Sequence, residues 1–246
     1  MPRIYIGIIF TFICVQLLPA IPTLLYGFIL KMRDTPVAEA EKLVANFALY
    51  ATLVGFILGL IIMVILLRKA GKPYKLDQET PLPVVPSVLF TILGLPLALF
   101  AQGFAALLEQ AMGIELGSEN TQQIIGIIEQ APIFILVVAV IGPILEEIVF
   151  RKVIFGALYE RFSFFPAAII SSVIFSVGHM ELEHTLLYTA MGLVFSFLYV
   201  YTKRIIVPII AHVAMNTFVV LAQYVFADEL EKYMQSVEGF IGGFGF

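Results

Sequence analysis

Seven apolar segments divide this sequence and restrict it to folds that a lipid bilayer allows. They lie at about 4–30, 43–67, 88–108, 132–158, 165–178, 185–201 and 205–226. A helix needs about 20 apolar residues to cross the hydrocarbon core. Of the 246 residues, 61% are hydrophobic and 13% are charged, whereas soluble domains are roughly 45–50% apolar. The sequence therefore predicts an all-α, polytopic membrane helix bundle of about seven transmembrane helices.

The polar stretches between the apolar segments are too short for a separate domain. We expect one membrane domain over residues 1–246, in which residues 1–130 hold three N-terminal spans and a short interfacial helix. That helix is predicted at 121–130, where isoleucines interrupt a polar pattern after a loop. Residues 131–227 form the segment that carries the buried polar groups described below, and residues 228–246 form an acidic tail that ends in glycines and phenylalanines.

The basic residues predict an orientation and exclude some partners. If the seven spans alternate, ten lysines and arginines fall on one face and four on the other. We expect the protein to lie in the cell membrane. The positive-inside rule then predicts that its N-terminus is in the cytoplasm and its C-terminus is outside. A net charge of −4 argues against nucleic acid as a partner. Cys14 is the only cysteine, so an internal disulfide and a thiolate metal cluster are excluded.

The fourth apolar segment contains three ionisable residues: Glu146, Glu147 and Arg151. Charged groups at membrane depth are costly and usually mark a functional site. Glu147 and Arg151 are four residues apart, so they face each other on a helix and can form a salt bridge that holds the Glu147 side chain. Glu146 lies about 100° further round the helix and is left free for chemistry.

Two later segments bring polar side chains with the same spacing of four. Phe175 precedes His179 in the fifth segment, and His212 precedes Asn216 in the seventh. A carboxylate and an imidazole that share a water molecule can act as a general base, while a second imidazole and an amide can donate hydrogen bonds to an oxyanion. The serines of the fifth segment lack the glycine-flanked elbow of a hydrolase nucleophile. The pattern therefore favours direct attack by water, with no acyl-enzyme.

Together these motifs resemble the CPBP family, which includes the type II CAAX prenyl endopeptidases and bacterial bacteriocin-immunity proteins. The motifs are Glu146-Glu147-x-x-x-Arg151, Phe175-x-x-x-His179 and His212-x-x-x-Asn216, in this order on successive apolar segments. The resemblance covers residues 132–226. It implies a metal-independent intramembrane glutamate protease that needs no cofactor. By this similarity Glu146 and His179 activate water, His212 and Asn216 form the oxyanion hole, and Glu147, Arg151 and Phe175 support them.

The resemblance implies a membrane-embedded or lipidated peptide as substrate. Candidates are a lipidated C-terminal tail, a small membrane peptide such as a bacteriocin or pheromone precursor, and a transmembrane signalling protein. The sequence departs from the eukaryotic and archaeal prenyl-protease pattern because it predicts no eighth span after the Asn216 helix. This departure bears on the prenyl group of the substrate more than on the hydrolytic site. The oligomeric state is not indicated.

Other interpretations use the same residues differently. Glu146, His179 and His212 could instead be three ligands of a zinc ion with an open water position. The buried carboxylates could also relay protons in a transporter or hold a partner helix in a scaffold without proteolysis. His184, which lies in an acidic turn beside Glu183, is predicted to be a solvated loop residue.

Overall fold

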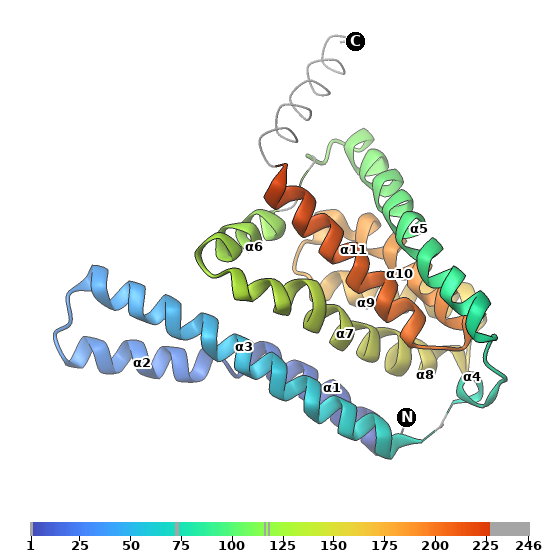
Figure 1. The fold of residues 1–246 in the computed structure, drawn as a ribbon, viewed down its shortest axis with the longest axis horizontal. Helices are drawn as coiled ribbons and strands as arrows, with labels where there is room; N and C mark the ends of the chain where they lie inside the picture. Colours follow the sequence, from blue (N-terminus) through green and yellow to red (C-terminus); the bar gives the residue numbers. More distant parts are fainter. Residues whose placement is uncertain (1, 72–73, 116, 118, 227–246) are drawn as a thin grey trace, which may run out of the picture.

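The structure is a computed structural model that describes residues 2–71, 74–115, 117 and 119–226, and every regular element in these ranges is a helix (Figure 1). The N-terminal part contains α1 (Arg3–Leu17), α2 (Ala20–Met32), α3 (Val37–Ala70), α4 (Lys75–Gln78), α5 (Val84–Ala111) and α6 (Glu119–Gln130). The fourth apolar segment consists of η1 (Pro132–Phe134), η2 (Leu136–Ile141), α7 (Gly142–Glu146), η3 (Glu147–Phe155) and α8 (Gly156–Tyr159). The chain continues through α9 (Phe164–Gly178), η4 (Leu182–His184), α10 (Thr185–Thr202) and α11 (Ile206–Val225).

The predicted all-α membrane bundle is confirmed. Within the described ranges, six helical stretches are long and apolar enough to cross a membrane: Arg3–Met32, Val37–Ala70, Val84–Ala111, Pro132–Tyr159, Leu182–Thr202 and Ile206–Tyr224. The remaining predicted segment is α9, an apolar helix of 15 residues, which is shorter than a full span. The protein is therefore an integral multi-pass membrane protein, and the part that the structure describes contains six long apolar helices and this shorter one.

The first apolar segment is divided into two helices at a proline. Pro19 precedes α2, where its missing N–H group breaks the hydrogen-bond ladder of a continuous helix. Figure 1 shows α2 and the first half of α3 as an arm that extends away from the other helices. The remainder of α3 packs closely on α1, since a Cβ atom added to Gly59 would lie 2.1 Å from a methyl carbon of Val15.

Glycines allow the helices around the site to approach one another closely. A Cβ atom at Gly192 on α10 would lie 2.2 Å from the hydroxyl oxygen of Ser172 on α9. A Cβ atom at Gly94 on α5 would lie 2.8 Å from side chains on both α10 and α11. In a bilayer the hydrophobic effect does not drive helices together, because lipid tails are as apolar as the side chains. Small residues at such contacts let the helix backbones approach closely and gain van der Waals contact. The helices α5, α9, α10 and α11 therefore form one packed unit.

The fourth segment departs from the regular helix that the spacing argument assumed. Both η2 and η3 are π-helical, and they flank the short α-helix that ends at Glu146. Turns of this kind are rare and often occur at functional sites.

The described residues test some of the predictions only in part. The structure contains the predicted helix near residues 121–130 as α6, which begins at Glu119. Its position in the membrane interface, the orientation of the protein and the division into residue blocks stay predictions. The tail at 228–246 lies outside the described residues.

Candidate active site

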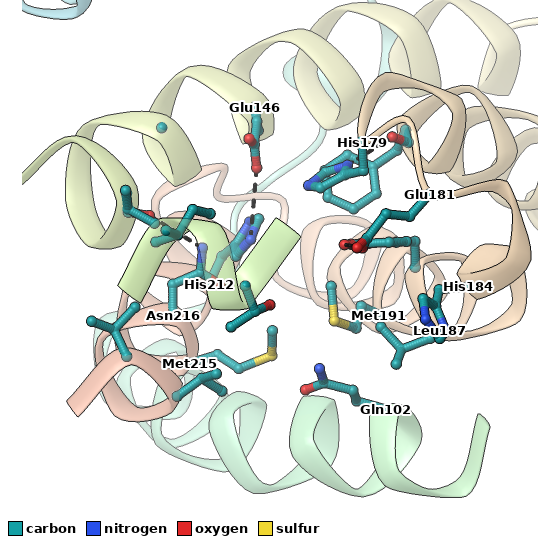
Figure 2. Close-up of a pocket in the computed structure, with 18 of the residues that line it drawn as sticks. Gln102, Glu146, His179, Glu181, His184, Leu187, Met191, His212, Met215 and Asn216 are labelled. Carbon is teal, nitrogen blue, oxygen red and sulfur yellow. Dashed lines mark hydrogen bonds and ion pairs between the residues drawn. The ribbon is translucent and has the colours of Figure 1, made fainter. Parts of the chain in front are cut away.

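A cavity of about 880 Å³ lies among the helices and collects the predicted site residues (Figure 2). The side chains that line it come from α1, α3, α5, α6 and the later helices. They include all the residues predicted to take part in the chemistry and one supporting residue: Glu146, Phe175, His179, His212 and Asn216. Glu147 and Arg151 do not line the cavity and are fully buried behind it.

The predicted ion pair between Glu147 and Arg151 is present in the structure. Nε of Arg151 lies 3.4 Å from Oε2 of Glu147, and neither side chain is exposed beyond 1%. The guanidinium also lies 4.6 Å from the ring centre of Phe175 and 5.5 Å from that of Phe195. Stacking of this kind stabilises a buried arginine whose charge has left water. The pair therefore joins η3 to the aromatic residues of α9 and α10.

Glu147 has a second partner that the sequence did not predict. Its Oε1 atom lies 2.9 Å from Nδ1 of His212 on α11. A carboxylate oxygen can only accept, so Nδ1 carries the proton and donates it. The His212 ring also stacks on Phe195, with ring centres 4.6 Å apart. Glu147 and Phe195 thus fix both the orientation and the tautomer of His212.

Glu146 faces the cavity from the end of α7. Its side chain is 17% exposed, in contrast to the buried side chain of Glu147. Oε2 of Glu146 lies 3.8 Å from Nε2 of His212, which is an ion-pair distance but too long for a direct hydrogen bond. Figure 2 shows the Glu146 carboxylate pointing toward the His212 ring, and the cavity that they line also includes His179. The carboxylate is therefore close to the His212 imidazole and open to a molecule bound in the cavity.

His179 follows the last residue of α9, and its ring is held on several sides. Nδ1 lies 3.0 Å from the carbonyl oxygen of Phe175, so this nitrogen donates and Nε2 is the free acceptor in the neutral ring. The ring centre lies 4.4 Å from that of Phe175 and 4.2 Å from that of Tyr188. Phe175 therefore contacts His179 both through its carbonyl group and through its ring, and its supporting role in catalysis stays a prediction.

Asn216 lies one turn beyond His212 on α11. Its Nδ2 atom donates a hydrogen bond of 3.3 Å to the carbonyl oxygen of Val138 in η2. An amide nitrogen has two hydrogens, so the second remains available to an acceptor in the cavity. The π-helical backbone of η2 therefore sets the direction in which the Asn216 amide points.

The prediction that His184 is a solvated loop residue is wrong. Its exposure is 7%, and its Nδ1 atom lies 2.9 Å from Oε2 of Glu109 on α5. The other oxygen of Glu109 accepts the backbone N–H of Leu187 at 3.0 Å. Both Glu109 and His184 line the cavity. Glu109 directly follows the predicted apolar segment 88–108, so its place in the sequence indicates a carboxylate near membrane depth but not its partner.

The zinc interpretation requires Glu146, His179 and His212 to be grouped as ligands. Among the residues that the structure describes, no three His, Cys, Asp or Glu side chains are arranged so that they could hold a metal ion. Zinc ligands lie about 2.0–2.3 Å from the ion and surround it. The donor set for that interpretation is therefore not formed in this structure.

Comparison with known proteins gives the family. Residues 128–218 match the family model described as "Type II CAAX prenyl endopeptidase Rce1-like". The chain is 46% identical over 194 residues to the "Putative membrane peptidase YdiL" of Bacillus subtilis (strain 168), covering 78% of this chain and 79% of the relative. It is 37% identical over 191 residues to the "Membrane-embedded CAAX protease MroQ" of Staphylococcus aureus (strain USA300), covering 75% of this chain and 77% of the relative. No solved structure matches. The chain belongs to the Rce1-like type II CAAX prenyl endopeptidase (CPBP) family of membrane-embedded peptidases.

Proposed function

We propose that this peptidase hydrolyses a peptide bond of a membrane-embedded or lipidated substrate with a water molecule that Glu146 activates. The observation that carries the proposal is the convergence of Glu146, His179, His212 and Asn216 on one cavity from three separate segments: α7, the end of α9 and α11. The Glu147–Arg151 pair, by contrast, is buried away from the cavity. Glu146 thus reaches the cavity while the neighbouring Glu147 is buried. We expect this difference if Glu146 is catalytic and Glu147 supports the site.

Activation of water would use Glu146 and His179 together. The Glu146 carboxylate takes one proton from water as the water oxygen attacks the carbonyl carbon, and it later returns that proton to the leaving amine. The free Nε2 of His179 accepts a second hydrogen bond from the same water and orients it. No side chain forms a bond to the substrate in this scheme.

Stabilisation of the oxyanion would use His212 and Asn216. The tetrahedral intermediate places a negative charge on the former carbonyl oxygen, and hydrogen-bond donors aimed at it lower the barrier. Asn216 has a free amide hydrogen for this task. Since Nδ1 of His212 already donates to Glu147, its Nε2 donates to the oxyanion when the ring carries both protons. Glu147 then balances the charge of the ring.

The substrate would be a peptide that reaches the cavity from the bilayer. Apolar side chains make up much of the cavity wall, including Phe56, Phe134, Met191 and Met215. Such a wall suits apolar side chains or a lipid group next to the cleaved bond. A lipidated C-terminal tail, a small membrane peptide and a transmembrane signalling protein remain the candidates.

The decisive experiment is the Glu146→Gln substitution, which keeps the size of the side chain and removes the base. Membrane peptides from cells with the wild-type protein and the variant are compared by mass spectrometry, and the peptide that differs is then cleaved with purified protein. We expect Glu146→Gln to abolish cleavage without changing the helix content. Glu115→Gln is the matched control, because Glu115 also lines the cavity but is exposed, and it should remain active.

Two results would overturn parts of this proposal. Cleavage that persists in Glu146→Gln would remove Glu146 from the chemistry, and an unchanged biological output without any cleavage would favour a scaffold. A strong chelator should leave the rate unchanged. If it abolishes hydrolysis and zinc restores it, the metal-free mechanism is wrong.

A further inference from the structure

The turn between α9 and α10 carries His179 and adopts a backbone shape that needs support. His179 follows the end of α9, and Met180 has a φ of 62°, in the left-handed region that residues other than glycine rarely adopt. Such a conformation persists only where the surrounding structure holds it. The position of the His179 ring therefore depends on contacts that α10 and its neighbours provide.

Tyr188 supplies one of these contacts directly. Its ring stacks on the His179 ring with centres 4.2 Å apart and planes inclined by 29°. The Tyr188 hydroxyl donates a hydrogen bond of 2.7 Å to Oε2 of Glu181, which lies in the same turn as His179. Phe175 contacts the imidazole through an edge contact. The imidazole is therefore enclosed by two aromatic rings, and its Nδ1 is tied to the Phe175 backbone.

Glu109 fixes the start of the helix that presents Tyr188. Glu109 is 2% exposed, and its carboxylate accepts one hydrogen bond from the backbone N–H of Leu187 and one from Nδ1 of His184. The Leu187 N–H belongs to the first turn of α10, where amide groups have no partner within the helix. A carboxylate at a helix N-terminus is also favoured by the helix dipole. Glu109 therefore connects α5 to the turn and sets where α10 begins, from outside the segment that the family model matches.

We propose that Tyr188 and Glu109 are positioning residues for His179. Tyr188 holds the plane of the imidazole so that Nε2 faces the cavity, and Glu109 holds Tyr188 in place through the first turn of α10. This inference rests on the proposed function, because it assigns the two residues a task only if His179 orients the attacking water. Neither residue needs to contact the reacting atoms.

The first test measures kcat and KM of variants on a fluorogenic peptide that contains the cleavage sequence found by the Glu146→Gln comparison. Tyr188→Leu removes the ring and should lower kcat about tenfold with KM unchanged. Tyr188→Phe keeps the ring, so its kcat should be only a few-fold below that of the wild type. Glu109→Gln should lower kcat in the same direction. The control is Tyr201→Leu, since Tyr201 lies on α10 but is 50% exposed and outside the cavity.

The second test uses free imidazole as a probe of the space that the His179 ring fills. In His179→Ala, added imidazole should restore part of the rate, since Phe175 and Tyr188 still form a slot for it. The concentration for half-maximal rescue should rise about tenfold when Tyr188→Leu is added to His179→Ala. A role of Tyr188 in folding alone would change the melting temperature but not this concentration.

The outcomes separate the two proposals. If His179→Ala is as active as the wild type, the proposed role of His179 fails and this inference fails with it. If His179→Ala is impaired but Tyr188→Leu and Glu109→Gln have the wild-type kcat, only the positioning role is overturned. Tyr188→Phe as damaged as Tyr188→Leu would assign the effect to the hydroxyl and would also overturn the stacking role.

Discussion

Nδ1 of His212 lies 2.9 Å from Oε1 of Glu147, which joins α11 to the π-helical η3 through a carboxylate with no solvent exposure. The other oxygen of Glu147 lies 3.4 Å from Nε of Arg151. One buried carboxylate thus serves two cationic or donor groups. Removal of one member of such a buried set leaves a charge without compensation, and the free energy of unfolding falls by about 3–5 kcal/mol.

This network predicts that Glu147→Gln destabilises the protein more than it would at an exposed site. The uncharged amide leaves the Arg151 guanidinium buried and unpaired, and we expect a loss of about 3–5 kcal/mol. The double variant Glu147→Gln/Arg151→Met removes both charges and should regain most of that stability. Denaturant unfolding in detergent micelles, followed by circular dichroism, measures both.

The double variant also separates stability from catalysis. It lacks the carboxylate that orients His212, so it should stay nearly inactive even though it is folded. Glu39→Gln is the control, because Glu39 is an exposed residue at the start of α3 and its loss should change little. If the double variant regains activity along with stability, then Glu147 has no role at His212 beyond its pairing with Arg151.

Asn216 offers a test of the oxyanion hole. Asn216→Ala removes a hydrogen-bond donor that acts in the transition state, so kcat should fall about 10²- to 10³-fold while KM changes little. Steady-state kinetics on the identified peptide measures this split. Gln223→Ala is a matched control: Gln223 is an amide residue on the same helix that also lines the cavity. Equal losses in both variants would contradict a specific role for Asn216.

The positions of the apolar helices along the chain could be predicted because bilayer thickness sets helix length. Each predicted apolar segment corresponds to helical structure, and the Glu147–Arg151 pair follows from spacing on one helix. Residues four apart on one helix lie near each other whichever helices pack around it, so such local pairs are readable from the sequence, and the Glu147–Arg151 pair forms even though η3 is π-helical. The same logic placed Phe175 next to His179, which the structure shows through both ring and backbone contacts.

The remaining contacts join residues far apart in the chain and depend on how the helices pack. The Glu147–His212 and Glu109–His184 contacts each span more than 60 residues. No local pattern fixes which helices become neighbours, so the acidic residues next to His184 in the sequence indicate a solvated loop and not the buried contact with Glu109. The π-helical turns were likewise missed, because hydrophobic periodicity cannot separate them from α-helix within a few residues. Tertiary packing decides these features.

Lys152, which directly follows Arg151 in η3, forms another largely buried ion pair. Lys152 pairs with Asp77, and Oδ1 of Asp77 also accepts the Tyr199 hydroxyl at 2.9 Å. The side chains of Lys152 and Asp77 are 14% and 4% exposed, so the pair joins α4 to η3 through a largely buried contact. We expect Asp77→Asn to lower the free energy of unfolding by about 3 kcal/mol or more.

The control for Asp77 is a pair of the same type near the surface. The Lys203–Glu79 pair has a distance of 2.6 Å, but the Glu79 side chain is 51% exposed. Water and salt screen such a pair, so Glu79→Gln should cost less than about 1 kcal/mol. Denaturant unfolding of both variants in the same detergent makes the comparison. Similar losses in the two variants would contradict a special role for the buried pair.

The burial of Tyr74, which directly precedes α4, should make the protein less stable at alkaline pH. Burial raises the pKa of Tyr74 to about 12, with smaller contributions from the charges of Asp77 and Glu160. The hydroxyl also donates to the carbonyl oxygen of Val153 in η3 at 3.2 Å. Because the folded state favours the neutral phenol, this stability is fully present below the unfolded value of about 10 and is lost as the pH rises toward about 12.

Tyr74→Phe keeps the ring that packs on Gly156 but cannot ionise. It should lower the melting temperature slightly at pH 8, because the hydrogen bond to Val153 is lost, yet it should show a smaller further drop between about pH 10 and 12 than the wild type. Melting curves across that range in one detergent give both numbers. Tyr50→Phe is the control, since it removes the same hydroxyl group from a tyrosine that is 63% exposed. If Tyr74→Phe and the wild type lose stability in parallel, the alkaline transition belongs to other groups.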